Sequence, residues 1–228
     1  ISALYYRYPY ISSSIFGCYQ ANTALAQRDT KWNATQYGNF QVYAVRDESE
    51  SDNVYFYLTS SAGALIPAMS SSLFAGAYDN QKWNIAVTVK PKFIEDLGPA
   101  NLAATPVNDY EIHFYGCSTI HDHITHEFFV TRSITAVNGE RFVESAKRLY
   151  VGAQYTDFTA SLITPSDVKI SSLRAWSDAL SNEEVKYHAL HPLNVGRKDP
   201  LANVGYPGAN TFLPKYHSLM LNWDFQNV

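Results

Sequence analysis

Short segments in which apolar residues alternate with other residues dominate the chain. Residues 40–46 (FQVYAVR) and 53–59 (NVYFYLT) are rich in β-branched and aromatic residues, and the charged residues 47–52 between them predict a hairpin turn. In the second strand, one face carries Val54, Phe56 and Leu58, while the other face carries two tyrosines and a threonine. Because neither face is strongly polar, we expect this strand to lie inside a sheet.

Further strands follow along the chain. Residues 83–90 (WNIAVTVK) alternate most clearly, directly after the turn-forming pair Asp79-Asn80, and residues 109–115 (DYEIHFY) alternate as well. A strand over 128–137, the pair Asn138-Gly139 and a returning strand over 141–151 predict a second hairpin. We also predict strands over 168–176 and 219–225. The last of these either pairs with the tyrosine-rich residues 4–10 or begins a following module.

One helix is predicted, and it begins at a capping box. The Ser181 hydroxyl can accept a hydrogen bond from the Glu184 amide while the Glu184 carboxylate reaches back, and Pro192 ends the helix. Residues 95–108 and 192–218 carry several prolines and glycines and predict irregular chain, the second as a long arm. Many strands with a single short helix favour an all-β sandwich or jelly roll.

Three further patterns occur in order along the chain: residues 79–89 (DNQKWNIAVTV), residues 149–153 (LYVGA) and residues 167–185 (DVKISSLRAWSDALSNEEV). They resemble, respectively, the G-x-W strand, the l-y-i-G strand and the closing strand and helix of the laminin-G / concanavalin-A-like lectin superfamily. The resemblance covers roughly residues 10 to 190. It implies a two-sheet antiparallel β-sandwich over residues 1–191, with Trp83 and Trp176 anchoring the core between the sheets. Residues 192–228 would form an irregular arm and a terminal strand that pack on the sandwich or link it to a neighbouring module.

Composition narrows the classes of function. The 228 residues include 17 Tyr, 12 Phe and 4 Trp, which suits either a tyrosine-rich β core or a surface that docks sugars or proteins. A net charge of −4 without a basic stripe argues against nucleic acid as a partner, and no apolar run is long enough for membrane insertion. Only Cys18 and Cys117 are present, so we expect reduced, buried thiols, although a single bridge between them stays open.

Few residues form a pattern that suggests a catalytic or metal-binding site. In residues 109–113, Asp109, Glu111 and His113 share one strand face, but they lack the E-x-D-x-x-E order of the family's glycosidases, so we interpret them as a polar outer face. Gly116, His121, His123 and Glu127 partly resemble the first cupin metal motif, with the wrong spacing and no second motif. If this cluster binds anything, a divalent metal is expected.

The remaining candidates are a calcium site and a glycosylation site, and neither is clearly indicated by the sequence. The oxygens of Asp79, Asn80 and Asp157 are available for a rim calcium site, but their spacing does not indicate one. The segment Asn33-Ala34-Thr35 is a glycosylation sequon. We therefore assign no catalytic residue, metal ligand or cofactor, and leave the binding residues unassigned.

The fold type alone does not decide function, because its members bind glycans, bind proteins, act as spacers or hydrolyse polysaccharides. We predict a non-catalytic structural or adhesive module of a larger assembly, on a virion or in an extracellular location, with protein neighbours and glycans as its candidate partners. The link to virions rests on a similarity to bacteriophage proteins with tyrosine-rich strands and Pro/Gly arms. The alternative is a dedicated carbohydrate-binding lectin domain, and the third hypothesis is a metal-dependent, cupin-like enzyme.

Overall fold

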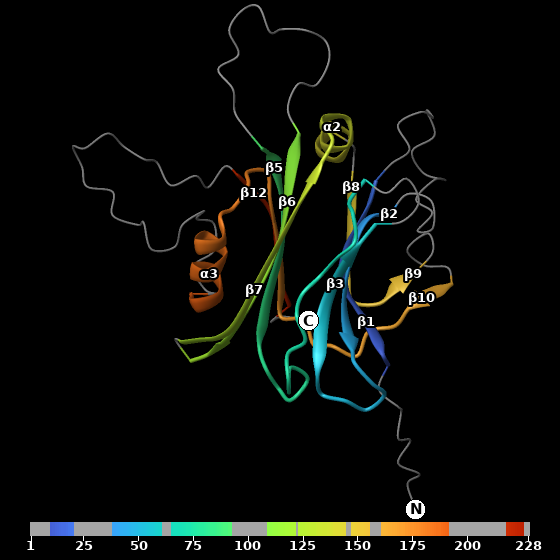
Figure 1. Ribbon diagram of the computed structural model, residues 1–228, viewed down its shortest axis with the longest axis vertical. Coiled ribbons are helices and arrows are strands. Elements are labelled where there is room, and N and C mark those ends of the chain that lie inside the picture. Colours follow the sequence, from blue (N-terminus) through green and yellow to red (C-terminus); the bar gives the residue numbers. More distant parts are fainter. Residues whose placement is uncertain are drawn as a thin grey trace, which may run out of the picture.

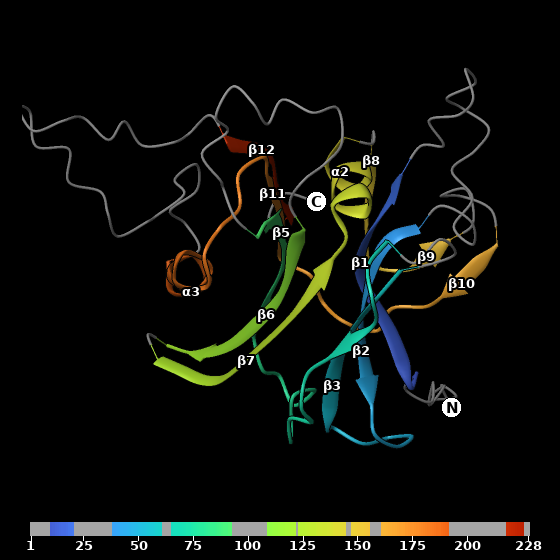
Figure 2. The same cartoon turned by 45° about the horizontal axis from the view of Figure 1, so that its top comes forward.

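The computed structural model describes residues 10–20, 38–60, 65–92, 109–121, 123–144, 147–155, 161–191 and 218–225. These residues form a mostly β structure with several antiparallel sheets and two short helices. The two largest sheets have three and five strands. Figures 1 and 2 show them beside each other, with helix α3 (Asn182–Leu190) on the far side of the smaller one and the strands β9 (Gln154–Tyr155) and β10 (Leu162–Thr164) beyond the larger one.

The five-stranded sheet has the order β4-β3-β2-β1-β8. Its strands are β1 (Ser12–Gln20), β2 (Gly38–Arg46), β3 (Val54–Thr59), β4 (Met69–Ser70) and β8 (Lys147–Val151). The predicted hairpin is confirmed, since β2 pairs antiparallel with β3 and Val42 lies opposite Leu58. Strand β3 also pairs with β4 and buries every second residue, so its predicted place inside a sheet is confirmed as well.

The three-stranded sheet has the order β5-β6-β7. Strands β5 (Trp83–Pro91), β6 (Tyr110–Ile120) and β7 (His123–Ile134) form an antiparallel meander, which confirms the predicted strands at 83–90 and 109–115. Ile112 and Phe114 of β6 are fully buried, as the alternation of that segment predicts.

The second predicted hairpin is wrong. Asn138 and Gly139 lie inside helix α2 (Ala136–Glu144), and only residues 147–151 of the expected returning strand are a strand. Gly139 serves helix packing here, because a β-carbon at this position would come within 2.1 Å of the Tyr110 ring. Phe142 of the same helix packs against Phe40, with ring centroids 6.1 Å apart. Tertiary packing of this turn of helix thus overrides the local turn preference of Asn-Gly.

Two small sheets complete the described structure. Strands β9 (Gln154–Tyr155) and β10 (Leu162–Thr164) form one, and strands β11 (Ser172–Trp176) and β12 (Leu219–Asp224) form the other. The predicted last strand is therefore confirmed as β12. It pairs with β11, a pairing that the sequence did not predict. Residues 4–9 lie outside the described residues, as do 93–108 and 192–217, which hold most of the predicted irregular segments.

The predicted helix is confirmed as α3 (Asn182–Leu190). The Glu184 amide donates to Ser181 Oγ over 3.2 Å, and the Ser181 amide donates to the Glu184 carboxylate over 2.7 Å, which completes the capping box. Val185 and Ala189 of α3 pack against Tyr115 and Cys117 on the outer face of β6. Helix α3 therefore covers part of the three-stranded sheet on the side away from the five-stranded sheet.

One apolar core joins the two larger sheets. It combines β2 and β3 side chains such as Val42 and Phe56 with β6 and β7 side chains such as Phe114 and Phe128. Trp83 packs in this core, with its ring centroid 4.7 Å from that of Phe56, as we expected. The expectation for Trp176 is wrong, because β11 pairs with β12 outside the two larger sheets and the Trp176 ring lies against His188 of α3, at 5.3 Å.

Candidate binding surface

The side of the five-stranded sheet that points away from the core is rich in tyrosine. Along β2 and β3, tyrosines alternate with core residues such as Val42 and Phe56, and along β1 and β8 they follow Cys18 and Leu149 of the core. Tyr43 lies directly opposite Tyr57 in the β2–β3 pair. We call this side the tyrosine face, and its members are Tyr19, Tyr43, Tyr55, Tyr57 and Tyr150.

A glycine allows the rings of this face to pack closely. Gly17 of β1 lies opposite Tyr150 of β8, and a β-carbon on Gly17 would come within 2.4 Å of the Tyr150 hydroxyl. The Tyr150 ring instead lies over the glycine and stacks on Tyr19, with centroids 5.2 Å apart and planes at 23°. Burial raises the pKa of Tyr150 far above its ordinary value, so its hydroxyl stays protonated.

The tyrosine face holds the β9–β10 sheet in place through hydroxyl groups. The Tyr43 hydroxyl donates to Gln154 Oε1 over 2.7 Å, and the Tyr19 hydroxyl donates to the Tyr155 carbonyl over 3.3 Å. Burial raises the pKa of Tyr43 to about 12 against the opposing effect of its hydrogen bonds to Thr164 and Gln154. At neutral pH Tyr43 is therefore a neutral phenol that can donate to Gln154.

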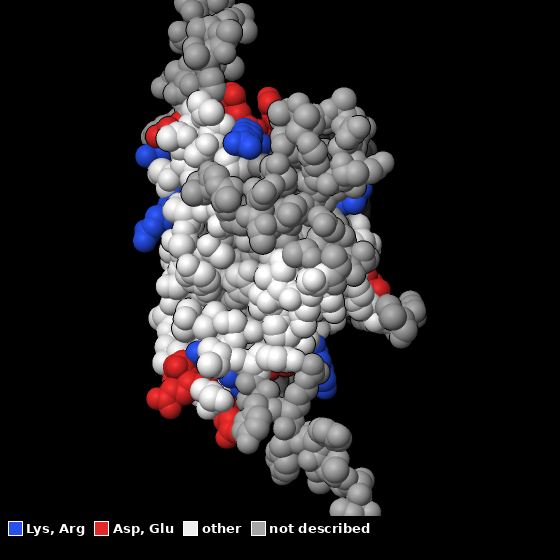
Figure 3. Space-filling model, turned by 90° about the vertical axis from the view of Figure 1, so that its right-hand side faces the viewer, with Lys and Arg blue, Asp and Glu red and all other residues white. Residues whose placement is uncertain are grey.

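The outer side of β9–β10 exposes apolar side chains. Leu162 is 49% exposed, Ile163 41% and Tyr155 38%, and Leu162 lies directly opposite Tyr155. Figure 3 views this side of the molecule, where charged side chains gather toward both ends and the described surface between them is largely uncharged. We call Tyr155, Leu162 and Ile163 the ribbon surface. Because exposed apolar side chains that lie together can mark a docking site, the ribbon surface is the candidate binding surface of the described residues.

A second group of exposed apolar residues lies on β12. Met220 is 67% exposed and Trp223 43%. Trp223 lies opposite Leu173 of β11, and its ring centroid is 6.4 Å from that of Phe225 at an angle of 55°. Because these two rings are far from coplanar, they do not form a flat stacking platform for a sugar.

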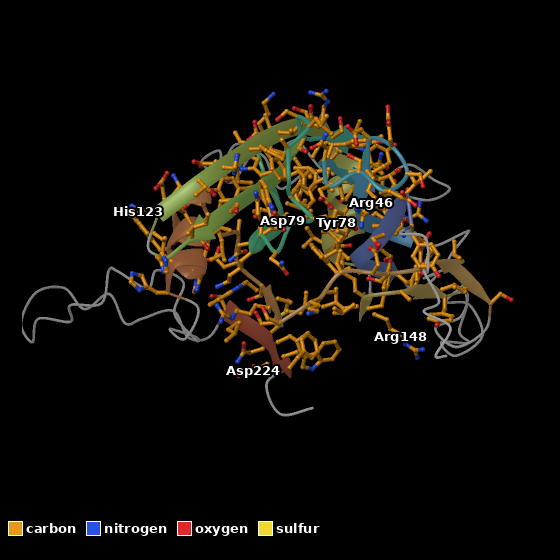
Figure 4. All side chains as sticks on the ribbon, turned by 90° about the horizontal axis from the view of Figure 1, so that it is seen from below. Arg46, Tyr78, Asp79, His123, Arg148 and Asp224 are labelled. Carbon is orange, nitrogen blue, oxygen red and sulfur yellow. The ribbon has the colours of Figure 1, made fainter. Side chains whose placement is uncertain are left out.

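A charged network centred on the buried Arg46 side chain lies at one end of the five-stranded sheet. The Arg46 guanidinium lies 3.5 Å from the Tyr78 ring centroid and 3.3 Å from Asp167 Oδ2, and Figure 4 shows Arg46 and Tyr78 side by side. Tyr78 and Ser13 both donate to Asp167 Oδ1, over 2.9 Å in the case of Tyr78. We call these four residues the Arg46 network. It joins β1, β2 and two loop segments.

The charges of this network are balanced. Arg46 also donates to the carbonyls of Tyr10 and Ser51. Desolvation raises the pKa of Asp167, but hydrogen bonds from Ser13, Tyr78 and Arg46 outweigh it and bring that pKa below its ordinary value. Each charged group therefore has partners, which indicates a structural role.

Sequence reasoning missed the Arg46 network, although the chain holds a signal for it. In residues 40–46, Phe40, Val42 and Ala44 point into the core, so the same alternation directs Arg46 inward. An inward arginine requires a buried partner. Nothing in the sequence identifies that partner as Asp167, which is 121 residues away.

The structure separates the residues of the predicted histidine cluster. His121 occupies the turn between β6 and β7 with a φ of 53°, so it does not share a strand face with His123, as two metal ligands on one strand would. His123 is exposed, and Glu127 accepts from the Tyr115 hydroxyl over 2.9 Å and lies 3.3 Å from Lys186 Nζ. Among the described residues, which leave out Asp122, no three His, Cys, Asp or Glu side chains are grouped to hold a metal ion.

Glu111 and His113 share the outer face of β6 as predicted, with Glu111 Oε2 and His113 Nε2 3.2 Å apart. Asp109 was expected on the same strand face, but it precedes the strand and is exposed. Asp79 and Asn80 form the predicted turn, and Asn80 has a φ of 54°. Asp157 and the sequon at residues 33–35 lie outside the described residues.

Both cysteines are buried and free, as expected. Cys18 lies in the core between the two larger sheets, whereas Cys117 lies beneath α3 in a separate cluster. Burial raises the pKa of Cys18 to about 12, and it also raises that of Cys117. Both side chains therefore behave as small apolar groups.

Neither described helix is long and apolar enough to cross a membrane. Comparisons with protein-family models, with curated proteins and with solved structures find no match to this chain.

Proposed function

We propose that this chain is a non-catalytic structural or adhesive module of a larger assembly and that a protein neighbour docks on its ribbon surface. The observation that carries the proposal is the exposure of Tyr155, Leu162 and Ile163 together on the small β9–β10 sheet. Stable interfaces cover roughly 800 Å² on each partner, with a few buried apolar or aromatic residues at their centre. The ribbon surface supplies side chains suited to such a centre.

We further propose that the two larger sheets are the layers of a concanavalin-A-like β-sandwich. Their shared core supports this assignment, as does the capped helix α3, which follows β11 where the resembling family segment places a helix. The fold leaves the function open, so the functional proposal depends on the exposed ribbon and not on the fold.

Site-specific photo-crosslinking in the native source tests the docking. A photoreactive phenylalanine at position 162 is expected to give one discrete adduct with a protein of the assembly. The same residue at Glu48, an exposed position in the β2–β3 turn, is the matched control and should give none. Leu162→Glu is expected to release the chain from the assembly. Retention of the Leu162→Glu chain, or adducts from position 48 alone, would contradict the proposal.

Glycan binding is the second candidate function, because the tyrosine face leaves the rings of Tyr55 and Tyr57 half-buried while Tyr19 is fully buried. Sugars bind by stacking on such rings and by hydrogen bonds to hydroxyl and amide groups. A glycan array with the whole chain tests it. Tyr57→Ala should abolish any signal, while Phe129→Ala, which removes an exposed ring on the other sheet, should leave the signal unchanged.

A further inference from the structure

Three polar or aromatic side chains form a row across the three-stranded sheet. Trp83 of β5 lies opposite Ser118 of β6, which in turn lies opposite His126 of β7. Directly opposed residues point to the same side of a sheet, and Trp83 packs in the core, so the whole row faces the five-stranded sheet. Gln81 lies just before β5 at the same end of the sheet.

Each of these four residues buries a polar atom that has no hydrogen-bond partner within the described part of the chain. The atoms are Trp83 Nε1, Ser118 Oγ, His126 Nδ1 and Gln81 Oε1. Ser118 is fully buried. A buried polar group without a partner costs about 1–3 kcal/mol, and native proteins hold few of them. Four at one end of one sheet therefore require a common explanation.

The surroundings of the row are aromatic. The Phe74 centroid lies 4.8 Å from that of Trp83 and 5.8 Å from that of His126, and the Trp83 and His126 rings stack at 6.2 Å. Rings offer no strong acceptor in their planes, so among the described residues the four polar atoms have only one another or a small guest as possible partners. Opposed residues have β-carbons roughly 4.5–5.5 Å apart, a spacing that one intervening oxygen atom bridges well.

We propose that this row is an internal hydration site that holds one or two ordered water molecules. The indole N–H of Trp83 can only donate and Gln81 Oε1 can only accept, whereas Ser118 and His126 can do either. Water accepts from the first, donates to the second and completes its remaining bonds with the other two. Buried water of this kind normally makes two to four hydrogen bonds to protein groups. The inference is independent of the proposed function.

Nuclear Overhauser effects between water and the indole protons test the proposal on the unaltered chain. Only four tryptophans are present, so their indole signals are readily resolved, and Trp83→Phe identifies the one that matters. A cross peak between water and the Trp83 indole proton is expected, with the sign of a long-lived water. Absence of that peak would overturn the proposal.

A matched variant separates water from a protein hydroxyl. Exchange of the Ser118 hydroxyl proton with solvent could relay magnetisation and imitate bound water. In Ser118→Ala the Trp83 cross peak should persist, because the smaller side chain leaves the water in place. Loss of the peak in this variant, with the Trp83 indole shift otherwise unchanged, would attribute the signal to the hydroxyl and refute the hydration site.

Discussion

Replacing Arg46 by methionine removes the centre of the Arg46 network while keeping a long, apolar side chain. Arg46 is 7% exposed and Asp167 24%, so their ion pair lies largely out of solvent. The second acid near Arg46, Asp52, lies 3.9 Å away and is 63% exposed, so it contributes little. The effect of the substitution therefore depends on Asp167, on the Tyr78 ring and on the two carbonyls that Arg46 binds.

The size of the effect follows from these contacts. Removing one partner of a buried ion pair typically costs about 3–5 kcal/mol. Asp167 keeps the hydrogen bonds from Ser13 and Tyr78 and is partly exposed, which moves the value to the lower end. Loss of the contact with the Tyr78 ring adds roughly 1 kcal/mol. We therefore expect Arg46→Met to lower the free energy of unfolding by about 3–4 kcal/mol.

Urea unfolding of the whole chain measures this difference. We expect the midpoint urea concentration to fall while the slope of the unfolding free energy against urea concentration stays the same. Arg132→Met is the matched control, since Arg132 is exposed on β7 and its removal should change stability by less than about 0.5 kcal/mol. The reasoning is refuted if Arg46→Met costs less than about 1 kcal/mol, because the buried pair then adds little to stability.

Four further predictions follow from single contacts. Because the folded pKa of Asp167 is lowered, its contribution to stability is complete above the unfolded pKa of about 3.9 and is lost as the pH falls through the folded value. Asp167→Asn should therefore be less stable at neutral pH, and urea titrations should show that its free energy of unfolding falls less steeply toward acidic pH. Gly17→Ala should destabilise by about 1–3 kcal/mol, because its β-carbon meets the Tyr150 ring, and a midpoint unchanged in urea would contradict this. Ser181→Ala should cost about 1 kcal/mol through loss of the α3 cap, and Ser181→Asp, which restores an acceptor, should recover most of it. Since burial raises the pKa of Cys18 to about 12, a thiol reagent at pH 8 should leave this residue unmodified until urea unfolds the chain, and rapid labelling of the native protein would show that the site is open.

Local pattern predicted the elements whose own residues decide them. The β2–β3 hairpin, β5, the start of β6 and the capped helix α3 all follow from alternation or from a cap within a few residues. The same logic failed at Asn138-Gly139, because the competition there is between a local turn and the close packing of a helix on Tyr110. Sequence pattern cannot include a contact with a residue 29 positions away, and so it favoured the hairpin.

The candidate surface was less accessible to sequence reasoning. Abundant tyrosine indicated either a core or a docking surface, and the alternation in residues 53–59 placed Tyr55 and Tyr57 on one face. The assembly of Tyr19, Tyr43 and Tyr150 on the same side depends on β1 pairing with both β2 and β8, which brings together residues more than 100 positions apart. The ribbon surface depends in addition on Gln154 meeting Tyr43.

The sequence by itself determined that the chain is mostly β, where its best strands lie and how its last described helix begins. Alternation and capping are properties of neighbouring residues, so they can be recognised without any knowledge of the fold. Only the tertiary structure decided that Trp176 leaves the core, that Arg46 finds Asp167 and that Trp83, Ser118 and His126 form one row. Each of these depends on which strands pair and in what register, and pairing is set by burial across the whole molecule.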